Sequence, residues 1–228
     1  MGATLDSVSM KKPHKFFDVV LENDLQKLYD FLIAMDSKIL QKNILNLKEE
    51  KLAEFKILPG AMTRIGIKDY NVFSFVNPEI YNLQVALREL TKTACEYYEI
   101  DFEKEQYFIH GWFNLDKSPV DKFYAFGGVN PKQNPSHFHD HSDGQGVPWF
   151  HGYYCVNAEP SSTFYQIDRD ENNIFENINK NNRAIISETG HPHGRDDWFE
   201  EKPRITIAYD ITPAKQLAYV DPNIWNVL

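Results

Sequence analysis

The stretch HFHDHSDGQG, residues 137–146, concentrates imidazole and carboxylate side chains in one short segment. In an extended backbone, alternate side chains share a face, so His137, His139, His141 and Asp143 would point the same way. Two glycines follow and allow the chain to turn. The segment therefore predicts a His-x-Asp pair, His141 and Asp143, that can converge on one metal ion at the end of a strand.

A second group of chemically useful residues lies downstream. His193 follows a predicted strand at 184–188, and Arg204 comes eleven residues later, at the start of another strand, where it shares a face with Thr206. Two imidazoles and one carboxylate form the facial triad of non-haem iron(II), which leaves three coordination positions open. A bidentate oxoacid would fill two positions and oxygen the third. The guanidinium of Arg204 would pair with the far carboxylate of the oxoacid.

Two questions of register remain open at this stage. A slip of two residues would make His139 and His141 the pair and give a three-histidine site; the shorter gap to the later HGYY motif favours His141 with Asp143. His191 competes with His193 as the distal ligand, and the distance to Arg204 favours His193. A His-x-Asp pair by itself occurs by chance in many proteins, so the alternative for this cluster is a solvated, histidine-rich loop.

The elements that must position these residues divide the chain by pattern. Residues 1–15 are predicted to be a flexible leader, and 16–228 a single domain. Within that domain, 16–100 provide helical support and 101–228 form the β core.

Helical spacing recurs three times in the N-terminal part of the domain. Leucines recur at this spacing over residues 21–32, and a second helix is expected over about 38–55. The clearest helix is the stretch 77–100, where Asn77 can cap the first turn and Pro78 suits its first position.

The C-terminal part changes character from about residue 105. Short segments rich in aromatic and β-branched residues are separated by polar loops, which is typical of antiparallel strands. We expect them to close into a double-stranded β-helix (jelly-roll) barrel with the N-terminal helices packed on its outside, a mainly β fold with α-helices. The segment RDENNIFENINKNNR, residues 169–183, is expected to be a surface loop. The predicted strands are EQYFIHGWFNL, WFHGYYCVN, STFYQID, RAIISE and RITIAYDI.

Composition excludes several classes of partner. The formal net charge is −9 and no basic stripe is visible, which argues against nucleic acid. No apolar run reaches the length of about 18 residues that spans a bilayer, and the N-terminus lacks an apolar signal core. The two cysteines, Cys95 and Cys155, have no partner motif, which fits reduced thiols. We therefore expect a cytoplasmic protein with a small-molecule substrate, and its oligomeric state stays open.

The stretch 109–212 resembles the iron(II)/2-oxoglutarate-dependent oxygenases, whose double-stranded β-helix carries a His-x-Asp pair, a distal histidine and an arginine about ten residues later. It is most similar to the short bacterial and phage-type branch. The resemblance covers less than half of the chain. The motifs that carry it are GWFNL, HSD, HGYYCV, SETGHPH and RIT.

The resemblance implies an oxygenase that hydroxylates a small polar substrate with iron(II), 2-oxoglutarate and O2. Two departures stand out: His151 replaces a common serine, and the polar SETGHPH replaces an apolar run, so a more polar pocket is implied. Carried over residue by residue, the iron ligands are His141, Asp143 and His193, the 2-oxoglutarate ligands are Arg204 and Thr206, and Asn114 and Tyr153 line the co-substrate pocket.

Two other functions fit the same residues. A cupin-like metal enzyme that uses no oxoacid would retain its activity after Arg204→Ala. A non-catalytic β-sandwich binding module, whose histidines only decorate a loop, would hold no metal, and replacing His141 and His193 together would change neither its stability nor its ligand binding.

Overall fold

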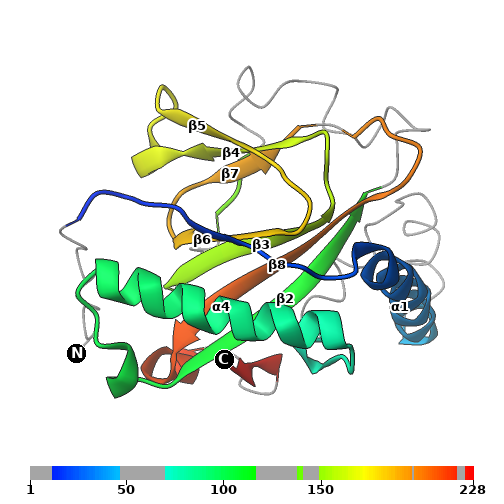
Figure 1. Cartoon of the computed structure of the whole chain (residues 1–228), viewed down its shortest axis with the longest axis horizontal. Helices are drawn as coiled ribbons and strands as arrows, with labels where there is room; N and C mark the ends of the chain where they lie inside the picture. The colour runs from blue at the N-terminus through cyan, green and yellow to red at the C-terminus, as the bar shows by residue number, and fades with distance from the viewer. Residues whose placement is uncertain (1–11, 47–69, 117–137, 141–148, 197, 220–223) are drawn as a thin grey trace.

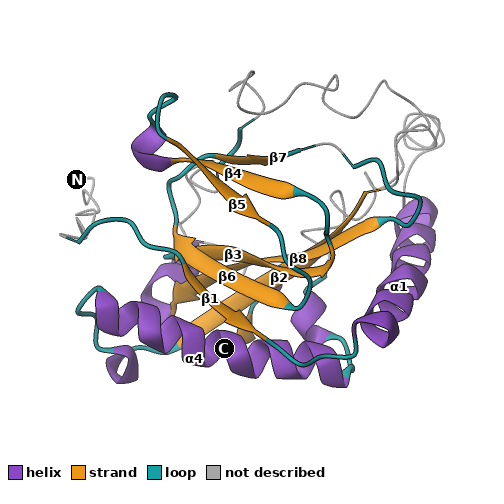
Figure 2. Cartoon of the chain, turned by 45° about the horizontal axis from the view of Figure 1, so that its top comes forward, coloured by secondary structure: helices purple, strands orange, loops and turns teal. Residues whose placement is uncertain are grey.

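Two antiparallel β-sheets face each other, and the helices lie on the far side of the larger sheet (Figures 1 and 2). This arrangement is seen in a computed structural model of the chain. The chain is thus mainly β with few helices, arranged as a β-sandwich, which agrees with the expected fold class at this level. The structure describes residues 12–46, 70–116, 138–140, 149–196, 198–219 and 224–228.

The longer helices are α1 (Leu25–Asn46) and α4 (Pro78–Tyr97). The predicted cap of α4 is confirmed, because the Asn77 side chain accepts hydrogen bonds from the amides of Glu79 at 2.9 Å and Ile80 at 3.3 Å. The prediction of two separate helices before residue 55 is corrected, since α1 continues unbroken between them. No described helix is long and apolar enough to cross a membrane. The short 3₁₀ segments are η2 (Val72–Ser74), η3 (Phe102–Lys104), η6 (Ile167–Arg169) and η7 (Ala214–Tyr219).

The larger sheet has six strands in the order β1-β6-β3-β8-β2-β9, and its neighbouring strands are antiparallel. Four of them cover the segments predicted as strands. The edge strand β1 was not predicted, because four residues are too short to show a period. The six strands of the larger sheet are β1 (Phe17–Val20), β2 (Tyr107–Asp116), β3 (Phe150–Asn157), β6 (Arg183–Glu188), β8 (Arg204–Pro213) and β9 (Asn226–Val227).

The smaller sheet has the order β5-β4-β7, and an isolated bridge between His139 and His193 extends it beyond β7. The expectation of a surface loop over 169–183 is corrected, because this segment contains β5. Most β5 side chains are exposed, so the strand has no apolar alternation to reveal it. The bounds are β4 (Ser162–Gln166), β5 (Ile174–Ile178) and β7 (His193–Arg195).

The larger sheet is buried on both faces, and β8 shows how its residues divide. Alternate side chains of a strand point to opposite faces. One set packs against the helices in the main core, and the other faces the smaller sheet with Trp112, Tyr153 and Tyr165. The first set is Ile205, Ile207, Tyr209 and Ile211, and the second is Arg204, Thr206, Ala208 and Asp210. The polar residues of β8 therefore lie between the sheets.

The two thiols are buried and unpaired, Cys95 in α4 and Cys155 in β3. Burial raises the pKa of each to about 11. Because the folded-state value lies above the unfolded one, this contribution to stability is complete below about pH 9 and is lost as the pH rises toward 11.

We predict that neither cysteine reacts with a thiol-specific disulfide reagent in the native protein at pH 8, because the thiolate fraction is on the order of one in a thousand. Unfolding the protein in denaturant should release both thiols. The measurement is the absorbance change of the reagent with and without denaturant. Rapid labelling of a thiol in the native protein would contradict this expectation.

Candidate functional site

His193, the predicted distal ligand, lies between the two sheets within a group of aromatic rings. On β7 it pairs in register with Tyr165 of β4, so the two side chains share the inner face of the smaller sheet. The His193 ring is 4.5 Å from the ring of His139 and 4.6 Å from that of His151, measured between centroids. Three imidazoles from three different segments therefore meet at this point.

His139 belongs to the predicted histidine segment and lies directly across from His193. The backbone amide of each residue donates to the carbonyl of the other, at 3.1 and 2.8 Å. Cross-strand partners point to the same face, which explains why the two rings meet. His141 and Asp143 lie outside the described residues, so their placement stays a prediction, as does the choice between the two registers.

His151, on the inner face of β3, has a carboxylate partner that sequence reasoning missed. Its Nδ1 lies 2.9 Å from Oδ1 of Asp210, and the two residues are paired in register between β3 and β8. The His151 side chain is only 7% exposed. A carboxylate partner at Nδ1 fixes the orientation of the imidazole ring, as the outer partners of metal-binding histidines do. Alternation along both strands was the available signal, but the register between them was not visible in the sequence.

His191, the competing distal ligand, points elsewhere. Its Nδ1 accepts the amide hydrogen of Asp168 at 2.9 Å, and its Nε2 lies 3.4 Å from Glu188. Its ring packs against that of His14, with centroids 3.9 Å apart. Among the ring contacts that the structure describes, His193 packs against His139 and His151, whereas His191 packs against His14.

Arg204 opens β8 and is buried between the sheets, with 3% of the residue exposed. Its NH1 lies 3.3 Å from Oδ2 of Asp116, and the other oxygen of that carboxylate accepts from Arg195 at 2.6 Å. Burial and the charge of Arg195 lower the pKa of Arg204, and Asp116 acts in the opposite direction. Asp116 thus contacts both guanidinium groups, and the charges of Arg204 and Arg195 also act on the neighbouring Asp196.

A chain of hydrogen bonds connects Arg204 with Tyr153. Nε of Arg204 donates to Ser161 Oγ at 3.2 Å, and Asn179 donates to the same hydroxyl at 2.8 Å. The Asn179 carbonyl oxygen accepts from the Tyr153 hydroxyl at 2.9 Å. Burial raises the pKa of Tyr153, so this hydroxyl stays protonated. Two residues predicted to lie at the co-substrate pocket are thus joined through Ser161 and Asn179, which sequence reasoning did not single out.

The other two predicted co-substrate residues are cross-strand neighbours. Thr206 of β8 pairs in register with Asn114 of β2, and Arg204 pairs with Asp116 one step further along the same face. Thr206 is buried and Asn114 is half-buried. The four predicted residues therefore lie on the inner face of the larger sheet, at the end where β8 begins.

Replacing Asp116 by asparagine should lower the free energy of unfolding by about 3 kcal/mol, because two buried or half-buried guanidinium groups would lose their shared counter-charge. Urea unfolding followed by tryptophan fluorescence measures this change. Asp170→Asn is the matched control, since Asp170 is exposed and its carboxylate accepts from the backbone and side-chain amides of the exposed Asn172. Equal midpoints for the two variants would show that the arginines do not depend on Asp116.

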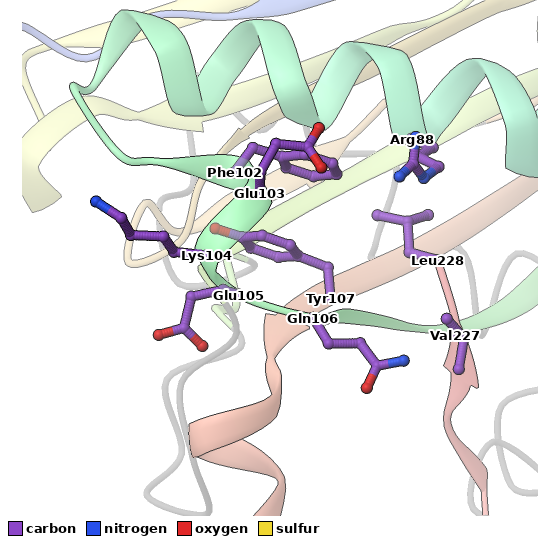
Figure 3. A pocket seen from close by; sticks show the side chains of 9 residues that line it. All are labelled: Arg88, Phe102, Glu103, Lys104, Glu105, Gln106, Tyr107, Val227 and Leu228. Atoms are coloured by element: carbon purple, nitrogen blue, oxygen red, sulfur yellow. The ribbon is translucent and has the colours of Figure 1, made fainter.

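Two cavities are described, one beside the cluster of His139, His151 and His193 and one on a surface away from it. A small cavity of about 10 Å³ lies beside the clustered histidines, where His151, Tyr165, Ser187, Glu188, Thr189, Gly190, His191 and His193 line it. A larger hollow of about 370 Å³ lies between α4, η3 and the C-terminus and is lined by Arg88, Phe102, Glu103, Lys104, Glu105, Gln106, Tyr107, Val227 and Leu228 (Figure 3). None of the predicted site residues lines the larger hollow, so size alone does not indicate where the chemistry occurs.

Comparisons with known proteins add a distant structural similarity. No protein-family model and no curated protein matches the chain. Among solved structures, it is similar to dioxygenase for auxin oxidation 1 from Arabidopsis thaliana, solved as a binary complex with 2-oxoglutarate, with 13% identity and a TM-score of 0.35. The match covers 63% of this chain and 56% of that chain. Because the similarity is so low, the chemistry of this chain has to follow from its own side chains.

Proposed function

We propose that the chain is an iron(II)- and 2-oxoglutarate-dependent oxygenase. The observation that carries the proposal is the convergence of His193 with His139 between the sheets, together with the buried Arg204 at the start of β8. Imidazole ligands suit iron(II), and a buried guanidinium suits the distal carboxylate of an oxoacid.

The order of the strands supports the corresponding architecture. From β2 onward the chain alternates between the larger and the smaller sheet: β2, the bridge at His139, β3, then the pair β4 and β5, β6, β7 and β8. This alternation is the one expected of a double-stranded β-helix, and we propose that fold for the two sheets. In it, the ligand strands belong to the smaller sheet and the arginine strand to the larger one.

His193, His141 and Asp143 would hold the iron, with His139 as the alternative to Asp143. Bound iron(II) would supply the activation of O2 coupled to decarboxylation of 2-oxoglutarate. Arg204 and Thr206 would bind the far carboxylate of the co-substrate.

The neighbouring residues orient this machinery and exclude water. Ser161 and Asn179 hold the side chains of Arg204 and Tyr153 in fixed positions. The Asp210 carboxylate holds the His151 ring in position, and that ring stacks on His193. These polar side chains between the sheets favour a small polar substrate.

The direct test uses the full chain, purified without oxygen. Addition of iron(II) and then 2-oxoglutarate should change the visible absorption, and admission of O2 should release succinate even without the substrate. Omitting iron is the control. A chain that binds no iron and shows no spectral change with 2-oxoglutarate is not this oxygenase.

One observation favours a second candidate, a cupin-like metal enzyme that uses no oxoacid. His151 brings a third imidazole, oriented by Asp210, to His193 and His139, and a three-histidine site would need no carboxylate ligand. The two candidates differ in their dependence on Arg204.

A further inference from the structure

We infer that His14, Glu188 and His191 form a second metal site, suited to Zn²⁺, that fastens the N-terminal segment to the connection between β6 and β7. The three residues each offer one ligand atom, and these atoms all lie within 4.8 Å of one another. The site shares no residue with the proposed iron ligands, and the inference does not depend on the proposed oxygenase activity.

The cluster is enclosed by the protein. The side chains of His14 and His191 are each 6% exposed, and that of Glu188 is 15% exposed. His14 comes from the segment before β1, whereas Glu188 ends β6 and His191 lies in the following connection. An ion held here would connect segments more than 170 residues apart, because His14 and Glu188 are separated by 174 positions.

The distances within the cluster match a tetrahedral ion. Nδ1 of His14 lies 3.2 Å from Oε1 of Glu188, and Nε2 of His191 lies 3.4 Å from the same oxygen. Charge-assisted hydrogen bonds are shorter, about 2.7–2.9 Å. Two ligand atoms on a tetrahedral zinc ion, each bonded at about 2.0–2.1 Å, lie about 3.3 Å apart. Both nitrogen–oxygen distances are therefore close to those expected around the ion.

The donor set indicates which class of ion the cluster would hold. Two imidazoles and one carboxylate favour zinc over the hard cations, which prefer oxygen. A cavity of about 10 Å³, lined among others by Glu188 and His191, adjoins the cluster.

Metal binding has a consequence for a neighbouring amide. Nδ1 of His191 now accepts the amide hydrogen of Asp168. A neutral imidazole bound to zinc through Nε2 carries its proton on Nδ1, so this hydrogen bond has to break. The amide of Asp168 is therefore a local reporter of occupancy.

The experiment titrates Zn²⁺ into the chelator-treated full chain that carries His193→Ala, which removes the proposed iron site. We expect one zinc ion per chain, and the amide resonance of Asp168 should shift. Adding His14→Ala or the isosteric Glu188→Gln should weaken zinc binding by at least about 100-fold and abolish the shift. Lys15→Ala is the control, because Lys15 is exposed beside His14 and outside the cluster.

Cobalt(II) provides a second readout, since tetrahedral coordination gives strong visible absorption. Circular dichroism establishes that each variant is folded, and Glu188→Gln keeps the test valid should His14→Ala unfold. Zinc affinity unchanged in both cluster variants overturns the inference. So does a zinc ion that the unmodified chain binds but the His193→Ala chain does not, because that ion would belong to the proposed iron site.

Discussion

Replacing His193 by alanine is expected to weaken iron(II) binding by more than about 100-fold and to reduce succinate formation to background. The variant loses the imidazole that faces His139 and stacks on His151. Loss of residues that only orient metal ligands costs 10–100-fold in affinity or activity, so loss of a ligand itself should cost at least as much. Anaerobic iron titration measures the binding, and succinate assay measures the turnover.

His110→Gln is the matched control for this prediction. His110 is a buried histidine on β2, and its Nε2 lies 3.2 Å from the carbonyl oxygen of Tyr70. The control should bind iron like the unmodified chain. Equal iron affinity in the His193 and His110 variants would remove the distal ligand from the proposal and with it the proposed activity.

Replacing Arg204 by alanine should raise the KM for 2-oxoglutarate by at least about 100-fold while iron binding is retained, since loss of a charge-assisted pair costs about 3 kcal/mol. Arg204→Lys should fall in between, because an ammonium group keeps the charge but lacks the planar fork of donors. The fold should survive, since Asp116 still has Arg195 as a partner. Succinate release as a function of 2-oxoglutarate concentration measures the effect.

Arg88→Ala is the control for this pair of variants, because Arg88 lies on α4 with its guanidinium carbon 5.3 Å from the centre of the Phe102 ring, on the remote hollow. An unchanged KM in Arg204→Ala would reject 2-oxoglutarate as the ligand of Arg204. An activity that needs the metal but not Arg204 would favour the cupin-like alternative.

The local features of the fold were predictable because short stretches of sequence encode them. Asn77 and Pro78 determine the start of α4. The Asn77 side chain accepts from the first free amides of the helix, and Pro78 has no amide hydrogen that would need a partner. The alternation of β8 places Arg204 and Thr206 on one face whatever the partner strands are. By contrast, β5 was not predicted. It is an edge strand with mostly exposed side chains, so its sequence does not show the alternation of apolar residues that indicates a strand.

The tertiary structure alone decided which of these side chains meet. His151 and Asp210 are 59 positions apart, and Asp116 and Arg204 are 88 positions apart; each pair depends on strand register. His14, predicted to lie in a flexible leader, has its side chain buried against Glu188 and His191. Residue types and their alternation determined which chemistry the chain can carry out. Strand register and sheet pairing decided which charged groups and imidazoles are in contact, because both depend on packing between distant segments.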